Sequence, residues 1–302
     1  MPRHLPVRIA AVTRLLLLAV ALTFANGAVA GATPRIAAAN WTVAETLIAL
    51  GVTPYAVADI PNYDTWVQSP PIPPETLDLG LRNQPNLELL AQKPPDLLIS
   101  SALFSKDNAR LERLMPVRLI DNFSSDLPYF EATLEMTREI ARLSHTEARA
   151  ESLIDGTRRA LDAASQALES LDRPVYVVQF SDSRHVRVFG EGNMVGTLMA
   201  RTSLDNAWTG PTNAWGYANV SIDRLAETPD AHIVVIKPFP RSVDAELANN
   251  HIWSRLPAVR AGRVSEIEPV WIFGGLQSIQ RLAHELVAAL APEGRGDTGE
   301  AS

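Results

Sequence analysis

The sequence predicts an α/β protein of two similar lobes, each a mainly parallel sheet flanked by helices, joined by one long helix with a ligand cleft between the lobes. At 302 residues the chain exceeds the usual size of a single domain. A pattern of helix cap, short helix, proline stop and apolar strand runs from Asn86 to Ile99 and returns about 135 residues later, from Ser221 to Ile236. A long helical stretch from 127 to 171 separates the two copies.

The first residues have the features of a secretory signal. Arg3, Arg8 and Arg14 lead into an apolar run, and small residues at 28–30 offer a cleavage site. An uncleaved anchor is the alternative, but the run is short for a bilayer. The expected division is a signal peptide (1–30), an N-terminal lobe (31–144), a linking helix (145–172), a C-terminal lobe (173–290) and a disordered tail (291–302).

Charge and cysteine content narrow the location and the partners. The formal net charge of −7 becomes −10 once the signal, with three arginines and no acid, is removed. Such a charge discourages binding to nucleic acid or to anionic lipid. The sequence has no cysteine, so we expect no disulfide and no lipid anchor. We therefore expect a soluble, monomeric protein of the periplasm.

The first lobe opens with a strand at 35–39. Thr42 and Glu45 have the spacing of a capping box, which predicts a helix that runs to Leu50. The stretch 59–74 contains five prolines and predicts an irregular surface loop. The remaining expected elements of this lobe are strands at 55–58, 97–99 and 117–120 and helices at 87–93 and 107–114.

The helical stretch is interrupted near 144–145, and its second part repeats apolar residues every three or four positions. A helix of about 26 residues would be about 39 Å long, enough to connect two lobes. The alternative is an ordinary amphipathic helix that covers a sheet. The second lobe is expected to contain strands at 175–180, 186–189, 232–236 and 263–267 and helices at 193–200, 244–253 and 275–290.

Few residue patterns point to catalysis or to a bound metal. The glycines between 190 and 196 lack the spacing of a dinucleotide loop, and no two histidines have the helical spacing of a zinc site. The sequence has no nucleophile elbow and no phosphate-binding loop. We therefore expect no catalytic residue and no metal ligand.

The six tryptophans are more informative. Trp208 and Trp253 suit the core of the second lobe, while the other four lie where loops meet predicted helices or strands. Aromatic side chains at loop ends of both lobes suit a cleft that stacks on a bulky ligand. The four expected cleft residues are Trp41, Trp66, Trp215 and Trp271.

Seven motifs occur in a fixed order along residues 34–290: Val57–Trp66, Pro70–Pro73, Gly80–Leu90, Asn206–Gly216, Val220–Leu225, Val259–Arg263 and Val270–Gly274. No single motif is diagnostic, but their order is specific. The ordered set resembles the family of periplasmic ferric hydroxamate siderophore-binding proteins, which deliver the iron chelate to an inner-membrane ABC permease.

The resemblance implies roles for individual residues. An arginine in the Gly-Leu-Arg loop of the family donates hydrogen bonds to hydroxamate oxygens, which assigns that role to Arg82. Two family positions that carry or can carry tyrosine are Phe104 and Phe273 here, so two hydroxyl donors are absent, and Tyr217 is a candidate to restore one. Acids on each lobe dock to the permease in related proteins, which assigns that role to Glu88 and Asp223.

The resemblance also implies that iron arrives and leaves as the siderophore chelate, with no other cofactor. Three hydroxamates fill the six coordination positions of iron, so no protein ligand is needed. The alternatives are a carrier of another bulky ligand, such as cobalamin, haem or a catecholate chelate, and a secreted α/β enzyme. A triply negative catecholate would require several basic cleft residues, and Arg82 alone is a weak complement to it.

Overall fold

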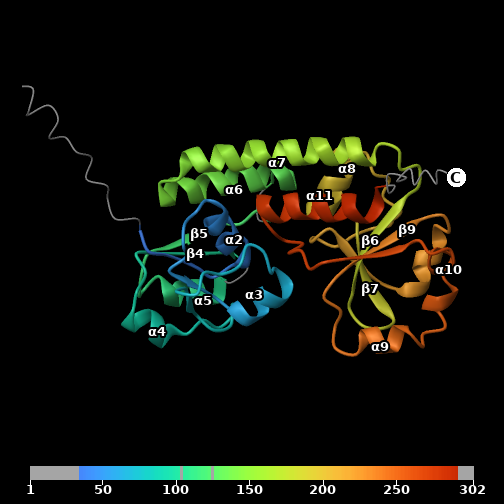
Figure 1. Cartoon of the computed structure of the whole chain (residues 1–302). Coiled ribbons are helices and arrows are strands. Elements are labelled where there is room, and N and C mark those ends of the chain that lie inside the picture. Colours follow the sequence, from blue (N-terminus) through green and yellow to red (C-terminus); the bar gives the residue numbers. More distant parts are fainter. Residues whose placement is uncertain (1–33, 103–104, 124–125, 292–302) are drawn as a thin grey trace, which may run out of the picture. The chain divides into compact units, whose positions relative to one another are not determined.

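The computed structural model describes residues 34–102, 105–123 and 126–291 (Figure 1). The expected signal peptide (1–30), the position of Phe104 and residues 292–302 of the expected tail lie outside these ranges. Within them the fold is α/β with two separate five-stranded sheets, as the sequence predicts. The described helices are all too short or too polar to cross a membrane.

The N-terminal sheet consists of parallel strands in the order β3-β2-β1-β4-β5. Successive residues of the central strand β1 enter different cores: Ile36 packs with the residues of helix α2, and Ala37 packs with Leu98. A strand buried on both faces requires an unbroken apolar run. The strands are β1 (Ile36–Ala38), β2 (Ala56–Val57), β3 (Leu77–Asp78), β4 (Leu97–Ser100) and β5 (Val117–Leu119).

Four helices connect these strands: α2 (Trp41–Ala49), α3 (Ile60–Trp66), α4 (Leu87–Gln92) and α5 (Ser105–Leu111). Asn86 caps α4 as predicted, because its side chain accepts a hydrogen bond from the Leu89 backbone. The predicted capping box of Thr42 and Glu45 is wrong. Asn40 is the N-cap of α2, and the side chains of Thr42 and Glu45 instead bind a segment about 230 residues away.

The prediction of an irregular loop over 59–74 is also wrong, because helix α3 lies within it. Pro61 occupies the first turn of α3, where a missing backbone N–H costs nothing. Asp59 precedes the helix with a φ of 60° and turns the chain into it. The other four prolines all follow the end of the helix.

Two helices, α6 (Tyr129–Ser144) and α7 (Glu147–Leu168), form the predicted helical stretch. His145, in the left-handed region with a φ of 56°, ends α6 at the predicted interruption. The buried stripe of α7 begins at Ala150 in the core of the N-terminal sheet and continues through Ile154 and Leu168 in the core of the C-terminal sheet. Helix α7, about 33 Å long, therefore connects the two lobes (Figure 1).

The C-terminal sheet has the order β10-β9-β6-β7-β8 and is mixed. Strands β6, β9 and β10 are parallel, whereas β7 and β8 run antiparallel to their neighbours. The connection 181–184 is too short for the crossover that a parallel pair needs. The strands are β6 (Val175–Phe180), β7 (His185–Phe189), β8 (Tyr217–Ser221), β9 (His232–Ile236) and β10 (Val264–Ile267).

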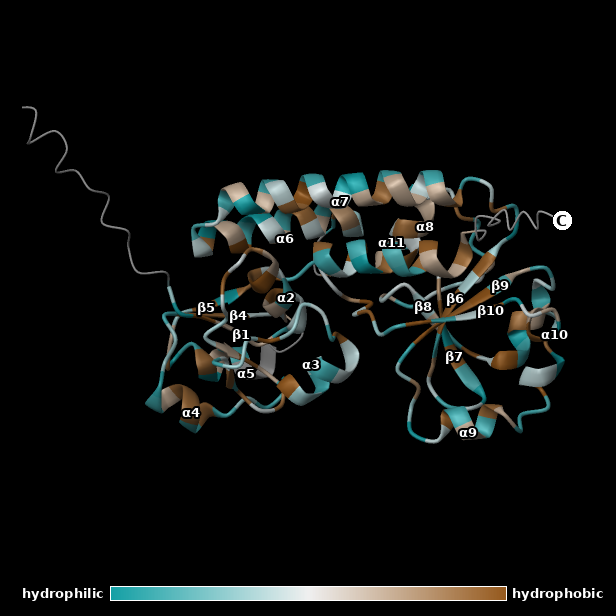
Figure 2. Ribbon diagram, in the orientation of Figure 1, coloured by the Kyte–Doolittle hydropathy of each residue, from teal (hydrophilic) through white to brown (hydrophobic). Residues whose placement is uncertain are grey.

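Helices cover both faces of this sheet, and Figure 2 shows teal and brown residues alternating along α7 above the sheet. Trp208 is buried in the C-terminal core and Trp253 packs against it, as predicted. The helices are α8 (Met194–Arg201), α9 (Val243–Leu247), α10 (Pro257–Arg260) and α11 (Leu276–Leu290), with 3-10 helices η2 (Ile222–Glu227) and η3 (Trp253–Arg255).

The two sequence repeats correspond to equivalent local structures, with one difference. Asn40 and Asn193 cap α2 and α8 through their side chains. Ser221 occupies the N-cap position of η2, as predicted, but its side chain makes no capping hydrogen bond: its hydroxyl donates to Asp223, and the following helix is 3-10.

The segment Trp271–Gly275, which we call the crossing segment, links strand β10 to helix α11 and is bound by the N-terminal lobe. Thr42 donates to the Phe273 carbonyl at 2.9 Å and accepts from the Trp271 indole at 3.1 Å. Two further donors, Tyr129 at 2.6 Å and Asn122 at 3.2 Å, satisfy the Gly274 carbonyl. The C-terminal lobe thus places two cleft aromatics against the N-terminal lobe.

Glu45 completes this junction from inside helix α2. Its carboxylate is fully buried and accepts hydrogen bonds from the Gly275 backbone and from the Ser278 hydroxyl at 2.6 Å. A carboxylate at this position caps helix α11 and interacts favourably with its dipole. Burial nevertheless raises the pKa of Glu45 to about 7, against the lowering effects of the two hydrogen bonds and of Arg281.

This buried acid predicts how stability depends on pH. Between the ordinary pKa of 4.5 and about 7, the folded protein binds more protons than the unfolded chain, so its free energy of unfolding falls as the pH rises. In urea denaturation, we expect the wild type to lose roughly 3 kcal/mol more than Glu45→Gln across this window. The matched control Glu88→Gln, at an exposed acid, should keep the wild-type slope. Equal slopes for the wild type and Glu45→Gln would contradict the prediction.

Candidate functional site

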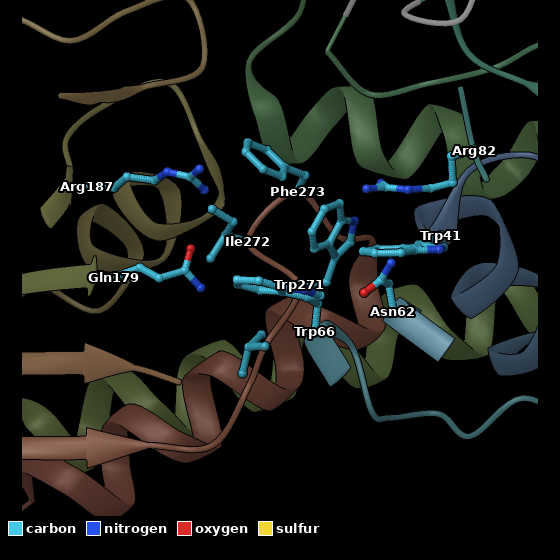
Figure 3. A pocket seen from close by; sticks show the side chains of 10 residues that line it. Trp41, Asn62, Trp66, Arg82, Gln179, Arg187, Trp271, Ile272 and Phe273 are labelled. Carbon is cyan, nitrogen blue, oxygen red and sulfur yellow. The ribbon is translucent and has the colours of Figure 1, made fainter. Parts of the chain in front are cut away.

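Two adjoining cavities, which we call the cleft, lie where both lobes meet the crossing segment. The first has a volume of about 390 Å³ and the second about 250 Å³. Both are lined by Arg82, Arg187, Trp271 and Phe273. Figure 3 shows Arg82 and Trp41 on one side of the first cavity and Arg187 and Gln179 on the other. The cleft is thus lined by residues of both lobes.

The structure brings all of the described aromatic residues predicted for the site into this cleft, while Phe104 lies outside the described residues. Their role in binding stays a prediction. Trp41, Trp66, Trp271 and Phe273 line the first cavity, and Trp215, Tyr217, Trp271 and Phe273 line the second.

The rings form a continuous chain between the lobes. Trp41 contacts Trp271 with 4.8 Å between ring centroids, and Trp271 contacts Phe273 at 5.1 Å. Phe273 contacts Trp215 at 5.5 Å. These pairs are edge-to-face, which leaves ring faces and edges for a ligand. Because each ring limits the rotamers of the next, the aromatic wall is preorganised.

Phe123, which the sequence analysis missed, belongs to the same wall. Its ring lies 5.3 Å from Trp215 and 5.4 Å from both Phe273 and Tyr129. It also lines the second cavity. Phe123 follows strand β5, so the rule that selected tryptophans at loop ends would have found it had the rule included phenylalanine.

Arg82 lies in the loop after strand β3, next to the loop before α3. Gly80, with a φ of 72°, allows the turn that brings its carbonyl to the Asp59 backbone N–H at 2.7 Å. The guanidinium carbon of Arg82 stacks 3.5 Å from the centroid of the Trp41 ring. Trp41 is itself fixed by an indole hydrogen bond to the Ala58 carbonyl at 2.9 Å. The arginine therefore rests on a rigid aromatic support.

The positive charge and the hydrogen-bond donors of the Arg82 guanidinium are only partly matched by groups of the protein. Its side chain is 28% exposed, and its Nε is 3.9 Å from a carboxylate oxygen of Asp59, beyond hydrogen-bond distance. That buried Nε has no hydrogen-bond partner among the described residues. Burial lowers the pKa of Arg82, and Asp59 opposes that effect. A buried donor without a partner favours a ligand that supplies an acceptor.

Two polar residues of the opposite wall, Arg187 and Gln179, were not predicted. Strand β7 pairs with β6 so that Arg187 lies directly opposite Gln179. Both line the first cavity, and the guanidinium carbon of Arg187 lies 5.4 Å from the Tyr217 ring centroid. The sequence signal was available: within His185–Phe189, the charged Arg187 shares a strand face with the buried Phe189.

Glu88 and Asp223 lie on the surface, outside the cleft. Both are exposed and occupy the first turns of α4 and η2, the matching positions that the repeat predicts. Glu88 accepts a hydrogen bond from Gln92, and Asp223 from Ser221. Neither is in an ion pair with another described residue, so both carboxylates are available to a basic partner.

The cleft offers aromatic faces, two guanidinium groups and neutral polar groups. Its lining includes no histidine and no carboxylate. Within the described ranges, no group of three or more histidine or acidic residues is arranged to hold a metal ion. The arrangement suits noncovalent capture of a bulky, oxygen-rich ligand.

Comparison with known proteins gives matches over most of the chain. Residues 36–270 match the family described as periplasmic binding protein. The chain is 34% identical over 258 residues to the iron(3+)-hydroxamate-binding protein FhuD of Escherichia coli K12, covering 85% of this chain and 86% of that one. It is 21% identical to the Fe(3+)-citrate-binding protein YfmC of Bacillus subtilis, covering 86% of this chain and 81% of the relative.

A solved structure shares the fold. The siderophore-binding protein FhuD of Vibrio cholerae, crystallised with Fe3+-Desferal, superimposes with a TM-score of 0.79 and is 25% identical. The match covers 86% of this chain and 100% of that chain. The similarity therefore includes both lobes and the helix between them.

Proposed function

This chain belongs to the periplasmic binding protein family, and we propose that it captures ferric hydroxamate siderophores and delivers them to an inner-membrane ABC importer. One observation carries the proposal: Arg82, stacked on Trp41, presents a buried donor without a partner in an aromatic cleft. The planar fork of a guanidinium suits two adjacent hydroxamate oxygens. The aromatic wall suits the apolar periphery of the chelate.

Iron is cargo in this proposal, carried only as the chelate. Three hydroxamates occupy the six positions of ferric iron with hard oxygen ligands, so the protein recognises the organic shell and supplies no ligand to the metal. The protein acts as a monomeric carrier in the periplasm and not as an enzyme. The cleft lining supports this assignment, since it provides no histidine or carboxylate to activate a nucleophile.

Binding by purified protein tests the proposal. A ferric trihydroxamate should quench the tryptophan fluorescence of the protein, because the proposed site places the cleft tryptophans against the bound chelate. We expect Arg82→Ala to weaken binding about 10- to 150-fold, or ~1.5 to 3 kcal/mol, the range for hydrogen bonds from a charged donor. Its thermal stability should stay near that of the wild type, because Arg82 makes no protein hydrogen bond through its Nε.

The control for this titration is Arg118→Ala, which removes an exposed arginine of the same lobe and should bind like the wild type. A folded Arg82→Ala variant with wild-type affinity would remove Arg82 from the site. Failure of the wild type to bind any ferric hydroxamate would overturn the proposed function.

Delivery is proposed to use Glu88 and Asp223, one exposed acid on each lobe, as contacts for basic residues on the two halves of the permease. The double variant Glu88→Lys with Asp223→Lys should bind the chelate normally, because neither acid lines the cleft. It should lose siderophore-dependent uptake of radioactive iron in cells. Reversal of two other exposed acids, Glu112→Lys with Asp230→Lys, is the matched control. Normal uptake by the first double variant would reject these docking contacts.

A further inference from the structure

The C-terminal wall of the cleft has a recognition element of its own. We propose that Arg187 and Gln179 form a carboxylate-binding subsite, so that the preferred ligand is a ferric hydroxamate chelate with a free carboxylate at its periphery. The inference rests on the proposed function, because Arg82 and the aromatic wall still bind the hydroxamate core. It adds the charge of the ligand, which sequence analysis left open.

Strand register places the two side chains together. Gln179 of β6 and Arg187 of β7 are directly paired in the antiparallel ladder, so their side chains are neighbours on one face. On β6 this face begins with Val175 and Val177, which are buried under the helices of the C-terminal core. The face changes from apolar to polar at Gln179, where it reaches the cavity. The two polar residues therefore lie where the strand reaches the cavity.

Neither side chain is satisfied by the protein. Gln179 is 3% exposed, and its amide is not among the buried side-chain groups that lack a partner, so the amide is accessible from the cavity that it lines. Within the described ranges, the side chains of Gln179 and Arg187 make no hydrogen bond and no ion pair, and Arg187 only approaches the Tyr217 ring at 5.4 Å. That ring contact does not account for Gln179. Both groups point into the first cavity in Figure 3.

The charges of the cleft favour an anionic ligand. Two arginines and no acid line the cavities, although the whole chain has a net charge of −7. Asp59 lies near Arg82, but no described acid is within ion-pair distance of Arg187. A neutral chelate bound in the cleft would displace water from the Arg187 guanidinium without supplying a negative group in its place, which costs free energy. A negative group on the chelate would compensate that cation.

The number of donors selects the kind of anion. One guanidinium fork binds the two oxygens of a carboxylate in a planar, bidentate arrangement. The adjacent Gln179 amide can donate a further N–H to the same group. A triply negative catecholate complex would leave at least one of its three charges unpaired here, because only two arginines line the cleft. A single carboxylate on a hydroxamate chelate matches this set of donors.

The test uses linear ferric trihydroxamates that share one iron core and differ only at the chain end. The end is a free amine, an N-acetyl amide, or an N-succinyl or N-glutaryl group with a terminal carboxylate, the last two differing in reach. We expect the wild type to bind at least one carboxylate form about tenfold or more tightly than the acetyl form, and the amine form most weakly. Added salt should reduce this preference, because it is electrostatic.

Variants then locate the preference. Arg187→Gln should bind the acetyl form at least as tightly as the wild type, because it removes the cation that a neutral chelate desolvates, and it should lose the advantage of the carboxylate form. Arg187→Lys should retain part of that advantage. Arg255→Gln, at an exposed arginine of the same lobe, is the control and should keep the full preference. Wild-type protein that binds the acetyl and both carboxylate forms equally would overturn the carboxylate subsite and leave the hydroxamate function intact. Protein that binds none of these chelates would overturn both, and this comparison depends on no variant.

Discussion

The buried contact between Glu45 and the start of helix α11 is the constraint on which the cleft depends. A carboxylate from the N-terminal lobe caps a helix that belongs to the C-terminal core, with Gly275 and Ser278 as donors. The crossing segment that precedes this cap carries Trp271 and Phe273. Its carbonyls are bonded by Thr42, Asn122 and Tyr129, so the position of the aromatic wall follows from buried hydrogen bonds. Ring packing alone would specify it less well, because edge-to-face contacts tolerate sliding.

The junction and helix α7 act together on the geometry of the cleft. The buried stripe of α7 is shared between the two cores, and Leu153 packs against both of them. A relative movement of the lobes would have to separate this stripe and break the bonds to the crossing segment. The ligand therefore meets walls whose positions are fixed before it binds, which lowers the entropy cost of capture. A carrier that must also release its ligand gains specificity from such a site without a large closing movement.

Local signals in the sequence predicted most of the fold, and contacts between distant segments account for what was missed. Asn86 caps a helix as its neighbours in sequence indicate, and the spacing of apolar residues identified α7. Glu45 was misassigned because its partner Gly275 is 230 residues away, and a capping box was the nearest local explanation. Arg187 was missed because its surroundings depend on the pairing of β6 with β7. The tryptophans were found since bulky aromatic side chains at loop ends are informative without knowledge of their neighbours.

The absence of a hydroxyl at Phe273 and the presence of Arg187 act together on ligand recognition. Phe273 contacts Trp271, Trp215 and Phe123, so its ring is a packing centre of the wall and offers no hydroxyl to a ligand. Hydrogen-bond donation in the first cavity therefore falls to guanidinium and amide groups. A hydroxyl donor depends less on ligand charge than a guanidinium does, because a buried guanidinium requires an acceptor that carries negative charge or a strong dipole. With two arginines and no acid in its lining, the cleft favours acidic chelates over neutral ones, while the aromatic wall suits a bulky iron core.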